Sequence, residues 1–237
     1  MSPTPGILFV NSKITSDALT PEVFTDWYES VHIPDIFVTS GIKSAFRYKS
    51  PTPDKVDRPY LALYPVKDIQ WLYSDEFKSI PVHSDVLPNE SRAIFDLADF
   101  DTRYYETIIT KAEPGRQGPA KAVVVVQFDS SSDDAADLFK ASTPTGTKPV
   151  RSQVLKLNFS RQNRLPEGKR QISKPPAYLG IVSPVVLSRR RLAYSKEANL
   201  PKYEYDELPA KPQPRAQDAV VKSFNLLKAF GDVTEAF

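Results

Sequence analysis

His32 is the residue of this sequence whose type and setting best suit acid–base chemistry. It lies in the segment Trp27–Asp35 (WYESVHIPD), and imidazole is the side chain whose ordinary pKa lies nearest neutrality. The spacing predicts His32 at the end of a helix, where the helix dipole favours the imidazolium form. Asp35 is near enough in sequence to orient the ring. At the mouth of a cavity, His32 would serve as a general acid or base; in the alternative interpretation it only binds a free carbonyl at the helix end.

The helix that must position His32 has clear signals at both of its ends. Thr20 is expected at the N-cap and Pro21 at the first helical position. Apolar residues then recur with helical spacing on one face: Phe24, Trp27, Tyr28 and Val31. Pro34 disfavours helical geometry at Ile33, so the regular helix is expected to stop or kink there.

His83 is the second candidate for acid–base chemistry. It is followed directly by Ser84 and Asp85, and Asp85 is near enough to orient it. If this segment folds over a cavity, His83 becomes a partner of His32. The alternative is a surface loop, because the three residues are contiguous and no G-x-S-x-G turn accompanies them.

The neighbouring strands supply candidate substrate-binding residues. In the expected strands 44–49 and 60–66, alternation separates Arg47, Tyr60 and Tyr64 from the apolar pair Leu61 and Leu63. The leucine face is expected to pack on helices, so the tyrosines and Arg47 would face the cavity and hold an enolate or carboxylate oxygen. In the alternative interpretation the tyrosines are half-buried core residues. Two aromatic residues complete the candidate lining: Tyr28 and Trp71.

The order of expected elements indicates an α+β fold with an internal duplication. Residues 1–112 read as β-α-β-β-α-β, the order of a ferredoxin-like unit. Residues 120–210 repeat it after a Gly- and Pro-containing linker at 113–119, with a helix expected at 187–197 and a final strand at 202–208. Residues 211–237 are expected to form a C-terminal amphipathic helix and tail, with an apolar stripe between Ala216 and Phe230. Two such sheets would pair into a barrel-like body with a ligand cavity between them.

The segment around His32 resembles a family signature. WYESVHIPD is similar to the W-Y-x-x-x-H-x-P-D motif of EthD-like proteins, of the dimeric α+β barrel superfamily, and residues 84–106 resemble a segment of its two-repeat fungal members. The resemblance implies tandem ferredoxin-like repeats that form an α+β barrel within one chain. It also implies small aromatic or polyketide-like ligands and cofactor-free cyclisation, decarboxylation, dehydration or oxygenation. Haem proteins of the same superfamily carry their proximal His in the second repeat, where this chain has none.

Composition narrows the partners and cofactors. The 237 residues include 31 Lys+Arg and 29 Asp+Glu, a balance that argues against nucleic acid or an anionic membrane as partner. The absence of Cys and the presence of only two His argue against a metal site. Without a G-x-G-x-x-G motif or a P-loop, no nucleotide cofactor is expected. No apolar run is long enough to span a membrane, so we expect a cytoplasmic protein.

These observations lead to one leading hypothesis. The chain is expected to be a cofactor-independent lyase or isomerase of secondary metabolism that acts on a hydrophobic, oxygenated small molecule, polyketide- or terpenoid-like, with His32 as acid–base. Three alternatives stay open: a cofactor-free oxygenase, a non-catalytic small-molecule-binding or stress-related protein, and an interaction module that uses the C-terminal helix. A homodimer also stays open.

Overall fold

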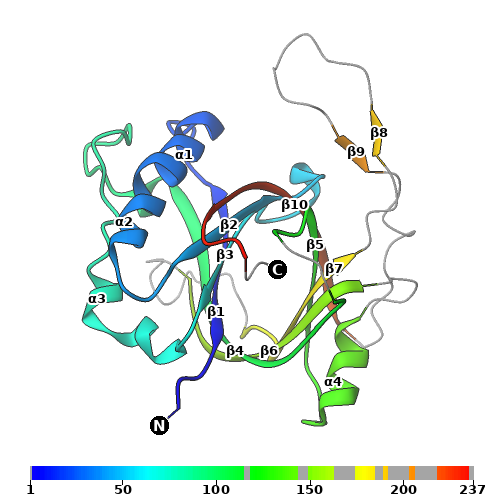
Figure 1. Cartoon of the computed structure of the whole chain (residues 1–237). Coiled ribbons are helices and arrows are strands. Elements are labelled where there is room, and N and C mark those ends of the chain that lie inside the picture. The colour runs from blue at the N-terminus through cyan, green and yellow to red at the C-terminus, as the bar shows by residue number, and fades with distance from the viewer. Residues whose placement is uncertain are drawn as a thin grey trace.

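The computed structural model describes residues 2–114, 118–143, 149–162, 174–184, 189–191, 203–205 and 218–234. Eight strands form the main body: β1 (Gly6–Ile14), β2 (Ser44–Lys49), β3 (Tyr60–Val66), β4 (Ala98–Ala112), β5 (Ala122–Phe128), β6 (Pro149–Gln162), β7 (Tyr178–Pro184) and β10 (Val220–Gly231). A separate pair consists of β8 (Arg189–Arg191) and β9 (Tyr203–Tyr205), and it projects away from the main body (Figure 1).

Helical segments cover the outside of the strands. The first half contributes α1 (Pro21–Asp26), the π-helix η1 (Trp27–His32), α2 (Ile33–Val38), α3 (Asp75–Lys78) and three 3₁₀ turns, η2 (Pro53–Lys55), η3 (Ile69–Tyr73) and η4 (Ile94–Asp96). The second half contributes α4 (Ala135–Ser142). Figure 1 shows α1, α2 and α3 together on one side of the body and α4 on another. None of the helices in the described ranges has the length and hydropathy needed to cross a membrane.

The eight strands close into one antiparallel barrel. Their order is β1-β3-β2-β10-β5-β7-β6-β4. The first half thus has the order β4-β1-β3-β2, and the second half has the matching order β10-β5-β7-β6. Hydrogen-bonded ladders between β4 and β6 and between β2 and β10 join the halves edge to edge, whereas the sequence had suggested two sheets packed face to face.

The barrel interior is filled with side chains, and the expected cavity between the sheets is wrong. Alternate residues of the strands point inward and are buried together, among them Phe9, Phe46, Tyr48, Leu63, Tyr105, Val125, Leu179 and Phe224. Eight-stranded barrels are just wide enough for side chains to fill. The expected alternation is therefore reversed: Leu61 and Leu63 face the interior, while Tyr60 and Tyr64 face the helices.

The predicted C-terminal helix is also wrong, because residues 220–231 form strand β10. This strand pairs with β2 on one side and β5 on the other, so it supplies the hydrogen-bonding partner that both edges need to close the barrel. Tertiary pairing therefore overrides the helical periodicity of the segment. Residues 216–217 of the predicted helix lie outside the described residues.

Two further segments of the second half were predicted as parts of the second repeat but form a separate pair of strands. The expected final strand at 202–208 corresponds to β9, which pairs with β8, and β10 takes the place in the barrel that this strand was expected to fill. The described part of the expected helix at 187–197 is β8, and the rest of that segment lies outside the described residues.

The strand assignment of residues 220–231 makes a testable distinction between two apolar side chains that the helical interpretation placed on one stripe. Phe224 is fully buried in the barrel interior, whereas Leu227 is 45% exposed. Phe224→Ala is expected to lower the free energy of unfolding by about 3–5 kcal/mol, and Leu227→Ala by about 1 kcal/mol or less. Urea titration measures both values. Equal losses would contradict the strand.

Candidate active site

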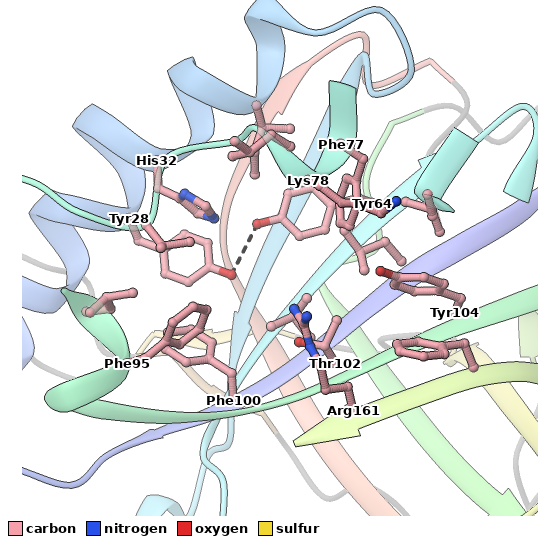
Figure 2. A pocket seen from close by; sticks show the side chains of 18 of the residues that line it. Tyr28, His32, Tyr64, Phe77, Lys78, Phe95, Phe100, Thr102, Tyr104 and Arg161 are labelled. Atoms are coloured by element: carbon pink, nitrogen blue, oxygen red, sulfur yellow. Dashed lines mark hydrogen bonds between the residues drawn. The ribbon is translucent and has the colours of Figure 1, made fainter. Parts of the chain in front are cut away.

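A cavity of about 500 Å³ lies outside the barrel, between its outer surface and the helices of the first half. Its floor comes from β1, β3, β4 and β6, and its walls come from η1, α2, η3, α3 and the segment that leads through η4. The lining is largely apolar and aromatic (Figure 2). A cavity of this size and polarity is typical of a small-molecule site.

The π-helix η1 places three of the site residues. The N–H of Ile33 donates to the carbonyl of Tyr28, five residues back. In an α-helix, residues five apart point roughly 140° away from each other, but a π-turn closes in about five residues and brings them to the same side. Trp27 and His32 accordingly stack, with ring centres 4.7 Å apart and planes inclined by 14°.

Of the two outcomes predicted at Pro34, a stop or a kink, the stop does not occur. α2 continues from Ile33 to Val38, so His32 lies inside the helical segment and not at its C-terminus. Pro34 lacks the N–H that would bind the Ser30 carbonyl in an α-helix. The dipole of a helix end therefore does not act on His32 as expected.

His32 is neutral in this setting. Burial lowers its pKa to about 4; the Arg47 charge acts in the same direction, and a hydrogen bond that the imidazole donates to the Pro81 backbone carbonyl acts against it. Its Nδ1 atom is buried and has no hydrogen-bond partner among the described residues, and His32 lines the cavity. The expected imidazolium is thus wrong, and the site offers a neutral imidazole that can accept a proton.

Tyr28 and Tyr64 form a hydrogen-bonded pair of phenols in the cavity wall. The Tyr64 hydroxyl donates to the Tyr28 hydroxyl over 3.2 Å (Figure 2). Burial raises the pKa of Tyr28, and it raises the pKa of Tyr64 well above the ordinary value. Because Tyr64 is the donor, Tyr28 keeps its own proton for a bond to a ligand.

The sequence predicts Arg47 as a lining residue, but in the structure it lies outside the cavity lining. It contacts Tyr28 instead. Its guanidinium lies 4.4 Å from the centre of the Tyr28 ring and pairs with the Glu29 carboxylate over 2.9 Å. Glu29 also accepts a hydrogen bond from Lys228 of β10 over 3.0 Å. This chain of contacts fixes η1 against strands from both halves.

The remaining acid–base candidates lie away from the cavity lining. Asp35 does not orient His32: within the described structure the Nδ1 atom of His32 is unpartnered, because the ring stacks on Trp27 and faces the cavity. His83 is exposed, and its backbone bridges to Ala93. Asp85 pairs with Arg92 and not with His83. A Ser-His-Asp arrangement is therefore absent from residues 83–85.

Trp71 and Tyr60, which the sequence predicts as lining residues, do not line the cavity. Both pack against other residues. Trp71 covers Gly41, where an added Cβ would come within 2.0 Å of the indole, and it donates to Glu76 over 2.6 Å. Tyr60 packs on Phe24, with ring centres 5.0 Å apart. Tyr28, His32 and Tyr64 are thus the predicted residues that the structure brings together.

Several lining residues had no signal in the local sequence. Thr102 and Tyr104 of β4 pair with Arg161 and Phe159 of β6, and all four line the cavity together with Lys78 of α3. Their positions depend on the register between strands from different halves, which residue spacing does not reveal. Within the described residues, no group of three His, Asp or Glu could hold a metal ion.

No family model matches the chain. Over 137 residues the chain is 34% identical to Core atranone cluster (CAC) protein 1 of Stachybotrys chlorohalonatus (strain IBT 40285), a match that covers 55% of this chain and 56% of that protein. The match thus spans about half the length of this relative.

Two solved structures are similar over nearly the whole chain. One is a candidate monooxygenase from Fusobacterium nucleatum, with a TM-score of 0.50, 9% identity and coverage of 99% of this chain and 97% of that one. The other is an anthrone oxidase-like protein, with a TM-score of 0.45, 14% identity and coverage of 95% and 93%. At 9% identity the first shows a shared fold alone.

The pKa of His32 is directly measurable because the sequence has only two histidines. In an NMR titration, one imidazole is expected to have a midpoint of about 4. This signal should disappear in His32→Gln and remain in the control His83→Gln. Because the folded pKa lies below the ordinary value of 6.5, protonation favours the unfolded chain, and the folding stability that His32 contributes is lost as pH falls from about 6.5 towards 4. A His32 midpoint near 6.5 would contradict the buried position.

Proposed function

We propose that the chain is a cofactor-independent enzyme of secondary metabolism in which His32 removes a proton from a hydrophobic, oxygenated substrate. The observation that carries the proposal is the pairing of two complementary groups in one apolar cavity. The unpartnered Nδ1 of the neutral His32 can accept a proton, and the Tyr28 hydroxyl, whose ring centre lies 5.4 Å from that of His32, can donate a hydrogen bond.

The reaction that best uses these groups begins at a carbon next to a carbonyl. His32 takes the proton, the electron pair of the C–H bond forms the C=C bond of an enolate, and the carbonyl oxygen gains the negative charge. The Tyr28 O–H donates to this oxygen where the charge develops. The charge formed beside His32 also raises the pKa of the imidazole at the moment when it holds the proton.

The second half of the reaction returns that proton. The enolate can expel a neighbouring hydroxyl as water when the imidazolium protonates it, which is a dehydration. It can also attack a second carbonyl of the same molecule, and the imidazolium then protonates the new alkoxide, which is a cyclisation. Both outcomes leave His32 neutral and require no redox partner, so we favour a lyase or isomerase.

The size and lining of the cavity favour a substrate with fused or aromatic rings. A volume of about 500 Å³ with rings on both the helix side and the strand side suits a polyketide- or terpenoid-like body. The relative from an atranone cluster supports a role in secondary metabolism. A non-catalytic binding protein would use the same cavity without proton transfer.

We assign the chain to the EthD-like group of α+β barrels with two ferredoxin-like repeats. Three observations support this proposal: the W-Y-x-x-x-H-x-P-D residues, the matching strand order of the two halves, and the fold shared with the candidate monooxygenase. The second repeat then ends with β10.

The proton transfer can be tested with 2-tetralone, a bicyclic aromatic ketone with an acidic methylene group. In D₂O without oxygen, the protein is expected to accelerate deuterium incorporation at this methylene, as followed by NMR. His32→Asn should lower the rate about 100- to 10,000-fold, while the control His83→Asn keeps it.

Two other results would change the assignment. Binding of 2-tetralone without any accelerated exchange would remove the enzyme proposal and favour a binding protein. The wild-type protein could instead consume oxygen when it is given 2-tetralone in air. If His32→Asn also loses the exchange, this result would replace the lyase or isomerase assignment with a cofactor-free oxygenase.

The pH dependence of the exchange follows from the direction of the pKa shifts. The active form has neutral His32, so kcat/KM should be constant at neutral pH and fall in acid with a midpoint of about 4. Because burial raises the pKa values of Tyr28 and Tyr64, no alkaline loss is expected up to about pH 9. A rate that increases with acidity would contradict a neutral base.

A further inference from the structure

The charged residues of the cavity lining that the structure describes are all positive. Among the described lining residues, Lys78 and Arg161 are cationic, and none is an Asp or Glu. His32 adds no charge at neutral pH, because burial lowers its pKa to about 4. An apolar cavity that carries two positive side chains and no described carboxylate is suited to a ligand with a negative group.

Arg161 lines the cavity from the strand side, and it is exposed to solvent. It lies on β6 directly across from Thr102 of β4, and Figure 2 shows it on the side opposite the helix that carries His32. The described residues provide no salt-bridge partner for it. Its charge acts on Tyr104, another lining residue: burial raises the pKa of Tyr104, and Arg161 lowers it.

Lys78 lines the cavity from α3. Its ammonium lies 3.3 Å from the Asp75 carboxylate, and both side chains are largely exposed. An exposed pair of this kind contributes little to stability. Lys78 can therefore exchange this partner for a ligand group at small cost.

We propose that the substrate of this cavity carries a carboxylate, which Arg161 binds and Lys78 assists. The planar guanidinium can make two parallel hydrogen bonds to a carboxylate, and the Thr102 hydroxyl beside it offers a further donor. The ring system of the ligand then lies along the aromatic lining. This proposal rests on the proposed function only in placing the substrate in the same cavity.

Such an anchor would also orient the substrate for proton transfer. With its carboxylate at Arg161, the body of the molecule extends towards Tyr28 and His32 on the helix side (Figure 2). Arg161 would then determine specificity without taking part in the proton transfer. Neutral analogues of the same shape would enter the cavity without this fixed orientation.

The test compares 2-naphthoate with 2-naphthamide, which has the same ring system and no charge, by calorimetry at low salt. The wild-type protein is expected to bind the carboxylate about 10-fold more tightly than the amide. Arg161→Gln should abolish this preference and leave amide affinity within about twofold, whereas Arg161→Lys should keep part of it. Lys78→Gln should reduce the preference less.

Arg92→Gln is the control, since Arg92 is an exposed arginine paired with Asp85 outside the cavity and should change neither affinity. Equal binding of the two ligands by the wild type, or an unchanged preference in Arg161→Gln, would overturn the proposal. The preference should persist in His32→Asn. If His32→Asn keeps the preference for 2-naphthoate and the wild-type protein fails the exchange assay, the anion site is correct and the catalytic assignment is wrong.

Discussion

The closed barrel is the constraint on which the rest of this structure depends. Eight antiparallel strands leave an interior that their own side chains fill, and Phe9, Phe46 and Phe224 occupy it. In the part of the barrel that the structure describes, a ligand therefore has no room in the interior. The cavity lies instead between the outer surface of the barrel and the helices that cover one side of it. The outward residues of the strands, such as Tyr64, become site residues as a result.

Burial sets the protonation states of the cavity in one consistent direction. Removal from water disfavours the charged form of every group, so it lowers the pKa of His32 and raises the pKa values of Tyr28 and Tyr64. The result is a neutral base beside two neutral phenols. The ion pair of Arg47 with Glu29 lies outside the cavity lining. The apolar lining thus prepares the groups for proton transfer.

The two halves of the chain contribute unequally to this site. The first half provides His32 and both phenols, while the second half provides Phe159 and Arg161 through the pairing of β6 with β4. Lys228 of β10 adds a contact to Glu29. Closure of the barrel therefore completes the cavity as well as the sheet, which explains why one chain with two halves has a site that spans both.

The sequence by itself indicated the strands of the first half, the start of its first helix and the segment that carries the site. The N-cap at Thr20, the helical spacing of Trp27, Tyr28 and Val31, and the alternation in residues 60–66 are local signals, because each depends on neighbours a few positions away. Only the tertiary structure decided which face of a strand points inward, that β10 is a strand, and that Arg161 reaches the cavity. These outcomes depend on hydrogen bonding between segments far apart in the chain, and on the side-chain volume that a closed barrel must hold.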